Sequence, residues 1–493
     1  MGFLTTEMKL LTDGEVRQIH DASLKALKNV GFKVEHERML KLLREIGADV
    51  DFNTMIVKFP PNLVEDCLKK QVFKMNGGAG SNEDYRNISE TNLKHPNNSW
   101  IATHIFCMNI LDMDDDNIRP ATLKDLESGA IIANELKNVG VNGPLVVPND
   151  VPVEVNDAYM WATMLTKSKK HASGELFNLD TIPYIADMCS IVAGSEEEMR
   201  KNPLVGFPCF PSSPFAYSRY SLDMAFAVID LKLPVRFGAS MVVAGFTGPV
   251  TLAGTLTVAN AETLGSMVMA EAVGGDCFGI MGVSINCNQT NGTALYASPE
   301  KTLLCFANRD IGKFYGMDGW RNFGGHVNGS DACFPGIQAG IEKGASFMFN
   351  NIGGAGGGHC GMLSSELASL PQMVIDDEIC DYMNRMNEGI KVDEETIAYD
   401  LIEHIGIAGS YIDMSSEEAL EHLSTHFRRE NWLPKLFVRE RPQKWQNNRE
   451  DTLTLAKEKV RRILKENDPC PLGAEKEKEI NKVLQDCVKN CVK

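Results

Sequence analysis

One stretch of the chain, GWRNFGGHVNGSDACFPGIQAG at residues 319–340, gathers side chains whose types could do chemistry. The ring faces of Trp320 and Phe323 can attract a cation that has no hydrogen-bond donor of its own. Because side chains alternate across a strand, only one of Trp320 and Arg321 can point inward within regular β structure. We expect Trp320 or Asn322 to face inward, and Arg321 to matter only if the strand ends early.

The same stretch holds charged and nucleophilic groups with more than one possible role. Arg321 can clamp a substrate carboxylate with two hydrogen bonds, or it can form an ion pair with Asp331 or Glu175 inside the protein. His326 and Asp331 are candidates for a proton-transfer pair. Cys333 is the only thiol of the stretch and a possible nucleophile.

Standard catalytic and nucleotide-binding motifs do not account for the chain. The sequence contains no HExxH, no GxSxG and no GxxxxGK[ST], and no GxGxxG follows the first predicted strand. Cys487 and Cys491 are four residues apart in a predicted tail helix, but no His or Cys lies near them in sequence. We therefore predict no metal site.

The elements that must position these side chains alternate between strands and helices. Residues 1–95 are mostly helical in pattern, with a short hairpin ahead of a helix that begins at Pro60–Pro61. From about residue 99, short β-rich runs end in Gly, Pro, Asn or Ser and helical runs follow them. The predicted strands are Trp100–Leu111, Val141–Val147, His171–Phe177, Leu204–Phe210, Pro234–Ser240, Asp276–Val283, Gly319–Gly325 and Phe347–Ile352. The predicted helices between them include Ala121–Leu136, Val153–Lys169, Ile182–Met199, Tyr217–Leu231, Leu252–Val273, Pro299–Tyr315 and Pro335–Gly344.

This alternation predicts an α/β fold, and its repeat number favours a TIM (β/α)8 barrel. Parallel strands need long crossovers, which the intervening helices supply. We expect a mainly helical N-terminal extension over residues 1–95, a barrel core over 96–363 and a C-terminal helical region packed on the barrel over 364–493. The segment NILDMDDDN inside the first predicted strand resembles a hairpin insertion, and a doubly wound sheet is the alternative architecture.

In a TIM barrel the active site lies at the C-terminal ends of the strands. That rule adds Glu175, Phe210 and Phe349 to the residues of the 319–340 stretch, with small polar groups such as Thr103 and Asp150 nearby. Acid–base pairs are few among these positions, whereas aromatic rings are many. Such a lining suits a cation whose charge one or two carboxylates balance. Alternatively, the aromatic rings only fill the barrel.

Composition excludes several classes of partner. The chain has 493 residues and a net charge of −17, which argues against nucleic acid and anionic membrane surfaces. Thirteen scattered cysteines without a signal peptide indicate reduced thiols and a cytoplasmic protein. No apolar run is long enough to predict a membrane span.

The order of motifs resembles a known family. LTDGEVRQIHDASLKALKNVGFKV, PPNLVEDCL, RPATLKDL, GPVTLAGTL, GSDACFPGIQAGIEK and THFRRENWLPKLFVRERPQKW together resemble the trimethylamine methyltransferase family over about residues 10–465. The resemblance implies a TIM barrel that moves a methyl group from an amine to the cob(I)alamin of a separate corrinoid protein. This chain carries no D-x-H-x-x-G corrinoid signature, so the cobalamin is expected to arrive on the partner and not to be bound permanently.

The resemblance also bears on the methyl donor. Family members that use trimethylamine carry pyrrolysine in the SD…P…QAG loop, where this chain has Cys333 at or near the matching position. The chain therefore resembles the non-pyrrolysine branch, whose donors are quaternary amines such as glycine betaine. Proline betaine, carnitine and γ-butyrobetaine are alternative donors. A quaternary ammonium leaves as a tertiary amine without a general acid, which agrees with the scarcity of acid–base pairs.

Two other functions compete with this one. The first is a barrel that binds betaines without catalysis. The second is a different barrel enzyme in which Asp331 and His326 transfer protons. Under the methyltransferase hypothesis, the substrate-binding residues are Trp320, Arg321, Asn322, Phe323, Glu175, Phe210 and Phe349. We also expect the chain to form a homo-oligomer.

Overall fold

The fold is taken from a computed structural model of the chain. It describes residues 9–75, 101–103, 105–172, 174–201, 207–233, 235–238, 241–275, 277–280, 282–317, 328–353, 357–412, 415–466 and 471–492. The predicted strand at Gly319–Gly325 lies outside these residues.

The N-terminal segment forms a small layer against the rest of the molecule. Its elements are α1 Asp13–Asn29, β1 Phe32–Val34, α2 Glu37–Glu45, β2 Asp49–Asp51, β3 Ile56–Lys58 and α3 Pro61–Met75. The predicted hairpin is confirmed, because β2 and β3 pair antiparallel and Pro61 opens the helix after them. Thr12 and Glu15 cap the start of α1 reciprocally. The strand β1 also pairs with β10, Ala216–Tyr217, so this layer is joined to the main body.

The centre of the body contains parallel strands connected by helices, which confirms an α/β fold. The strands β4 Ile101–Ala102, β7 Val139–Asn142 and β8 His171–Ala172 form one parallel set in chain order. The strands β9 Phe207–Cys209, β11 Val235–Gly238 and β13 Phe278–Ile280 form a second. A parallel bridge between Ala102 and His359 extends the first set on its open side.

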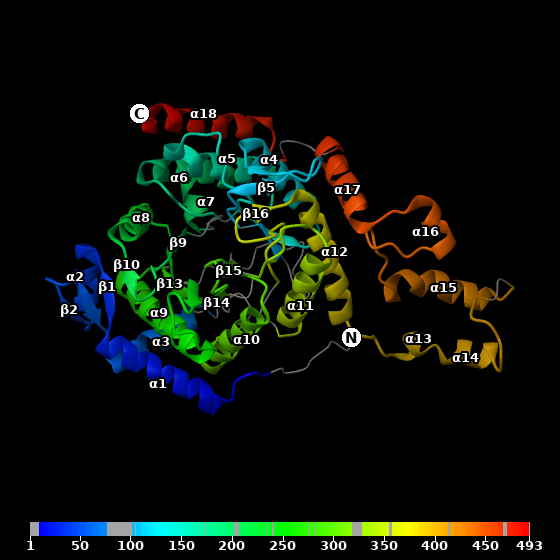
Figure 1. The fold of residues 1–493 in the computed structure, drawn as a ribbon, viewed down its shortest axis with the longest axis horizontal. Helices are drawn as coiled ribbons and strands as arrows, with labels where there is room; N and C mark the ends of the chain where they lie inside the picture. The colour runs from blue at the N-terminus through cyan, green and yellow to red at the C-terminus, as the bar shows by residue number, and fades with distance from the viewer. Residues whose placement is uncertain are drawn as a thin grey trace.

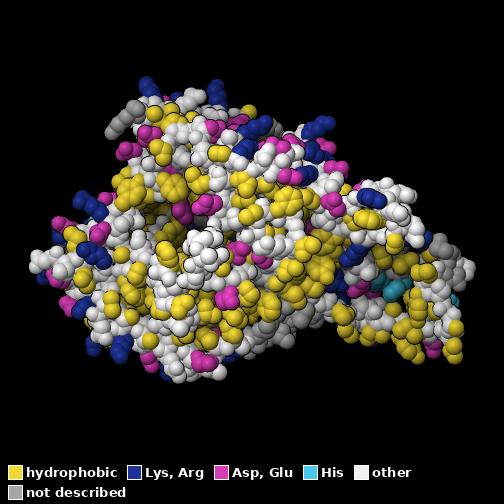
Figure 2. Space-filling view, in the orientation of Figure 1, with side chains coloured by type: hydrophobic (Ala, Val, Ile, Leu, Met, Phe, Trp, Pro, Cys, Tyr) yellow, Lys and Arg dark blue, Asp and Glu magenta, His cyan; other side chains and the backbone are white. Residues whose placement is uncertain are grey.

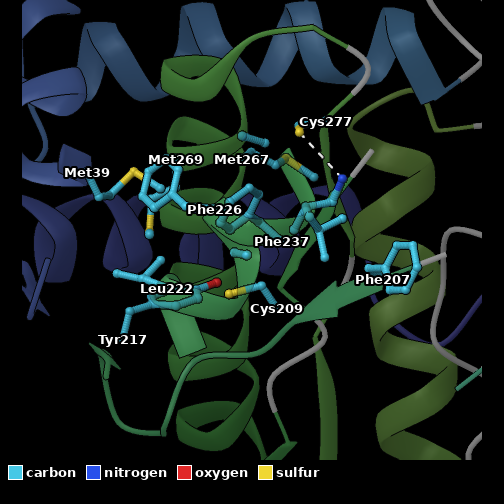
Figure 3. Close-up of a cluster of buried hydrophobic side chains, with 14 of the residues drawn as sticks. Met39, Phe207, Cys209, Tyr217, Leu222, Phe226, Phe237, Met267, Met269 and Cys277 are labelled. Carbon is cyan, nitrogen blue, oxygen red and sulfur yellow. Dashed lines mark hydrogen bonds between the residues drawn. The ribbon is translucent and has the colours of Figure 1, made fainter. Parts of the chain in front are cut away.

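Helices cover these strands on the outside (Figure 1). They are α4 Leu123–Glu135, η2 Val153–Val155, α5 Asn156–Lys167, η3 Leu179–Thr181, α6 Ile182–Ala193, α7 Glu196–Lys201, α8 Arg219–Asp230, α9 Leu252–Val273, α10 Pro299–Phe314 and α11 Ile337–Gly353. The helix α9 is buried along most of its length and contacts β11, β13 and the N-terminal helices α1 and α3. Figure 3 shows Phe226, Phe237, Met267 and Met269 meeting in the core between this helix and the strands. Burial of these apolar side chains holds the second strand set in place.

Further short strands lie beside these two sets, and they pair both antiparallel and parallel. The strands β5 Asn109–Leu111 and β6 Ile118–Pro120 form a hairpin, as predicted from NILDMDDDN, and β5 also pairs with β16 Leu367–Ala368. The strand β14 Val283–Cys287 lies between β12 Met241–Ala244 and β15 Ala294–Leu295. These additions follow strand ends, where the fold tolerates inserted loops.

The predicted strand at Phe347–Ile352 is wrong, because this segment is the last part of the helix α11. Its apolar and aromatic residues favoured a strand, but no Gly–Pro breaker separates them from the helix before them. Phe347 is buried while Met348 and Phe349 are exposed, as expected on a helix at the surface of the body. The segment that pairs with the first strand instead contains His359.

The C-terminal part divides into packed helices and a projection. The helix α12 Leu370–Asn387 packs on α11 and on α17 Thr452–Glu466, and α18 Ala474–Cys491 packs on α5 and α6. Between α12 and α17, residues 389–450 extend away from the body (Figure 1). We call this projection the arm; it contains α13 Glu394–Ile397, α14 Tyr399–Ile405, α15 Glu417–Glu430 and α16 Pro442–Asn448. Among the described residues, no helix is long and apolar enough to cross a membrane.

Candidate active site at the strand ends

Glu175 lies three residues beyond the end of β8. The Glu175 backbone is held on its inner side, because the indole of the fully buried Trp161 donates a hydrogen bond to the Glu175 carbonyl at 3.2 Å. Gly174 packs against the same indole, and a Cβ there would come within 3.0 Å of the Trp161 ring. The backbone that carries the Glu175 carboxyl group is therefore held in one position.

The Glu175 carboxyl group has an unusual environment for an acid. Its side chain is partly accessible, yet burial raises its pKa to about 7. That combination is expected for a group that lines a hollow inside the protein rather than the outer surface. Burial is the cause of this shift within the part of the chain that the structure describes, so a bound cation would favour the charged carboxylate.

Asn142 is the last residue of β7, and it pairs in register with Ala172 on the neighbouring β8. Its side chain is fully buried, and its Nδ2 group has no hydrogen-bond partner among the described residues. Thr103 lies beside it: the Thr103 hydroxyl donates to the Gly143 carbonyl at 2.8 Å and lies 3.2 Å from Asn142 Oδ1. A buried amide donor without an acceptor costs about 1–3 kcal/mol, so this position is suited to a ligand acceptor such as a carboxylate oxygen.

Asn142 was missed from the sequence because the second strand was predicted to end too late. The rule that the site follows strand ends then selected Asp150, which directly follows Asn149. Both have structural roles: Asn149 Nδ2 donates to three backbone carbonyls, and Asp150 accepts the Leu123 amide at the start of α4. The Asn-Gly pair at residues 142–143 was the available signal, because such a pair often ends a strand.

The structure gives Asp331 a structural role. Its two carboxylate oxygens accept the backbone amides of Tyr296 and Ala297, at 2.7 and 3.2 Å. Burial raises its pKa, while these hydrogen bonds oppose that shift. Ser330 and the Asp331 amide are in turn held by Glu342. The carboxylate fastens the loop ahead of α10.

The two aromatic candidates on described residues lie in different places. Phe210 directly follows β9 and is half-buried, as expected for a residue at a strand end. The loop after it is fixed by Glu262 on α9, which accepts hydrogen bonds from the Ser213 hydroxyl and the Phe215 amide, both at 2.7 Å. The assignment of Phe349 to the site is wrong, because this residue lies near the end of α11 and is 46% exposed.

The remaining predicted site residues lie outside the described part of the chain. They are Trp320, Arg321, Asn322, Phe323 and His326. Their roles stay predictions. Cys333 is described and exposed, in the loop that leads into α11.

A second buried cluster near the start of α10 was not anticipated. Lys301 is fully buried, and its Nζ lies 2.9 Å from the Cys305 Sγ one turn later. Within the described residues, no carboxylate lies within 4 Å of this ammonium group. The helical spacing of Lys301 and Cys305 was the signal in the sequence. Among the described residues, no group of three His, Cys, Asp or Glu side chains could hold a metal ion.

The loops that follow the parallel strands expose apolar side chains. Each of these residues lies between a strand end and the first turn of the next helix: Met108, Val153, Phe177, Tyr220, Phe246 and Val250. We call this set the apolar rim. Figure 2 shows a hollow near the middle of this face, with apolar and acidic side chains at its edge. Exposed apolar side chains on several loops at the strand ends are typical of a binding surface.

Comparison with known proteins gives a consistent result over nearly the whole chain. Residues 4–489 match the family model described as Trimethylamine methyltransferase (MTTB). A glycine betaine methyltransferase of Desulfitobacterium hafniense is 26% identical over 480 residues, which covers 96% of each chain. A trimethylamine methyltransferase MttB of Methanosarcina thermophila is 27% identical over 479 residues, which covers 95% of each chain. Among solved structures, the monomethylamine methyltransferase of Methanosarcina barkeri aligns with a TM-score of 0.45 and 9% identity, over 96% of this chain and 92% of that one.

Proposed function

Because this chain belongs to the trimethylamine methyltransferase family, we propose that it moves a methyl group from a small quaternary amine of the glycine betaine type to cob(I)alamin on a separate corrinoid protein. Family membership makes the chain a methyltransferase; the donor and the partner are our proposal. One observation carries it. At the ends of the adjacent strands β7 and β8, an unpaired amide donor and a desolvated carboxyl group suit the two ends of a betaine zwitterion.

Glu175 suits the cationic end of such a donor. A quaternary ammonium offers no hydrogen bond, so it must be held by charge and by ring faces. Glu175 supplies a carboxylate whose charged form is destabilised by burial unless a counter-ion binds. Binding of the cation would lower the pKa of this group and ionise it. The half-buried ring of Phe210 follows a nearby parallel strand.

Asn142 suits the carboxylate end. Its free Nδ2 donor lies at the end of the next strand, where a substrate oxygen can accept the missing hydrogen bond. Thr103 holds the amide from the other side. Arg321 stays a further candidate for the same task.

The proposed reaction places modest demands on the protein. Bound to its partner, cob(I)alamin supplies the nucleophile, and the departing group is a neutral tertiary amine. The chain therefore has to orient the donor and exclude water, because attack that neutralises charge is favoured in a dry site. Asp331 is engaged with two backbone amides, which disfavours its use as a proton-transfer base.

The apolar rim suits a protein partner that presents a large cofactor. Exposed apolar side chains on several loops at the strand ends can be covered when another protein docks there. The phenyl rings of Phe106 and Phe177 contact each other edge to face, which joins two of these loops. The sequence lacks its own corrinoid signature, in agreement with a cofactor brought by the partner.

We further propose that the parallel strands close into the eight-stranded TIM barrel expected from the sequence. The parallel pairs within β4–β7–β8 and within β9–β11–β13 join strands that would follow one another around such a barrel, and the bridge from His359 to Ala102 would join its last strand to its first. Helices on the outside agree with this closure.

Glycine betaine is the donor we favour over proline betaine, carnitine and γ-butyrobetaine. A short donor suits a carboxyl group and an amide donor on neighbouring strands, and a glycine betaine methyltransferase is among the similar proteins. We place the enzyme in the cytoplasm, since the twelve cysteines in the described residues form no disulfide with one another.

The test is a methyl-transfer assay with the full chain and a reduced corrinoid protein. Each quaternary amine and trimethylamine is added in turn, and the absorbance change of corrinoid methylation is followed. We expect turnover with glycine betaine and none with trimethylamine. Calorimetric binding of betaines without methyl transfer would instead favour a non-catalytic barrel, and turnover with trimethylamine alone would refute the proposed donor.

A further inference from the structure

The arm exposes an unusual amount of apolar surface. Thirteen of the 32 large apolar side chains that are exposed among the described residues lie in residues 389–450, which make up about an eighth of the chain. Ile407 is fully exposed, and Ile412, Tyr399 and Ile397 are more than half exposed. Figure 2 shows apolar side chains along the lower edge of this projection. Patches of this size on a monomer mark an interaction site.

The arm has little support from its own chain. The helices α13, α14 and α16 bury no residue, and α15 buries only Ala419. It is attached to the body at its base: Glu378 on α12 accepts the amides of Lys435 and Leu436, the Leu436 side chain is buried in the core, and Asp381 accepts a hydrogen bond from the Trp432 indole. Short helices without a packed face have little stability in water, so we expect another protein surface to pack against the arm.

The charges of the arm are divided between its two halves. Residues 389–424 contain nine acidic side chains and one basic, whereas residues 425–450 contain seven basic and three acidic. Within one chain, the halves meet at Glu395, which lies 4.0 Å from Arg429 and 3.8 Å from His426. The charges of two arms related by a two-fold axis would be complementary along their length, because each acidic half would face the basic half of the other copy.

We propose that the arm is a self-association surface that packs antiparallel against the arm of a second copy of this chain. The exposed apolar side chains amount to on the order of 1,000 Å² per copy, which exceeds the ~800 Å² that one partner contributes to a standard interface. Permanent homodimer interfaces are also the more apolar class. The arm shares no residue with the apolar rim. This inference does not depend on the proposed function.

The first test uses sedimentation velocity of the full chain over a wide range of protein concentrations. We expect a dimer or a higher even-numbered assembly. The double substitution Ile407→Glu with Ile412→Glu, on two exposed side chains, is expected to raise the dissociation constant about a hundredfold or more. The matched control, Val30→Glu with Ile118→Glu, changes two exposed residues on the body and is expected to leave the mass unchanged. A monomeric wild-type chain, or an arm variant that associates as the wild type does, overturns the proposal.

The second test uses the divided charge. A chain with Arg428→Glu and Arg429→Glu, and another with Glu417→Lys and Glu418→Lys, should each associate more weakly at low salt. When the two variants are mixed, every altered half can face an oppositely altered half, so a mixed dimer should form. Failure of the mixture to associate, when the wild type does, shows that the arms do not pack antiparallel.

Discussion

The body and the arm of this protein are stabilised in different ways. The body has large clusters of buried apolar side chains and a buried ion pair, in which Lys343 Nζ lies 2.5 Å from Asp376 with both side chains inaccessible. The arm is built from capped helices and exposed ion pairs such as Lys391 with Asp393. The same kinds of interaction occur in both regions, and only their burial differs. The comparison teaches that burial, not the number of contacts, decides what each interaction contributes.

The sharpest contrast is between two lysines. Lys343→Met leaves the fully buried Asp376 carboxylate without its cation, and we expect a loss of about 3–5 kcal/mol in the free energy of unfolding. Lys343 Nζ also donates to the His359 carbonyl, so the segment that meets the first strand loses its anchor to α11. Urea denaturation followed by circular dichroism measures the loss.

Lys391→Met removes the exposed ion pair of the arm and is the matched control. We expect no measurable shift in its urea midpoint, because water replaces the lost partner. Equal losses in the two variants would show that the arm is as tightly integrated as the body, and the contrast would fail.

A second pair of substitutions compares two tryptophans that make the same hydrogen bond. Trp161 Nε1 donates to the Glu175 carbonyl at 3.2 Å in the core, and Trp445 Nε1 donates to the Glu450 carbonyl at 2.8 Å in the arm. Trp161→Phe leaves the part-buried Glu175 carbonyl without its donor and should cost about 1–3 kcal/mol. Trp445→Phe should cost less than about 0.5 kcal/mol in the monomer, although its bond is the shorter. Thermal unfolding at low protein concentration tests the order of the two effects.

The same contrast explains which parts of the fold could be predicted from the sequence. Alternating β-rich and helical runs predicted the parallel α/β core, since each run must bury one face. The last strand was misplaced because aromatic residues near Phe347 indicate a strand or a buried helix equally well. The true pairing at His359 falls in a glycine-rich stretch that carries no apolar signal. For the arm, helical patterns were visible in the sequence, but whether a helix finds a surface to cover it depends on distant residues.

The candidate site shows a similar division. Glu175 was found because it follows a predicted strand closely. Asn142 was missed because an error of five residues in a strand end moves the selected position from the site to the loop beyond it. Its distinguishing property, a buried amide without an acceptor, exists only once the neighbouring strands are in place. Phe349 failed as a site residue for the same reason that the last strand failed.

Glu175, which lies in the body, should make both betaine affinity and folding stability depend on pH. A carboxyl group whose pKa rises from 4.5 to about 7 on folding favours the folded state at low pH, and this contribution is lost as the pH rises from 4.5 to 7. Glu175→Gln is therefore expected to raise the melting temperature at pH 8 while weakening betaine binding about tenfold to a hundredfold. In the wild type, betaine affinity should increase with pH through about 7.

Calorimetry and thermal unfolding at pH 5 and pH 8 check this combination. Glu418→Gln in the arm is the control, and it should change neither betaine affinity nor its pH dependence. If Glu175→Gln leaves betaine affinity intact at pH 8, the carboxyl group does not face the cation.

The smallest expected effect concerns Asn142. In the free protein its Nδ2 donor makes no bond within the described residues, so Asn142→Ala removes an unsatisfied group. The lost packing of three heavy atoms and the lost hydrogen bond from the Thr103 hydroxyl to Asn142 Oδ1 oppose this gain. We expect stability to change by less than about 1 kcal/mol, while the affinity for glycine betaine falls roughly tenfold, the equivalent of one lost hydrogen bond to a charged group. Choline, which has the same ammonium group and no carboxylate, should bind the variant and the wild type equally well. Equal losses for both ligands would place Asn142 at the cationic end of the site, and a loss of stability without any loss of affinity would make it part of the core.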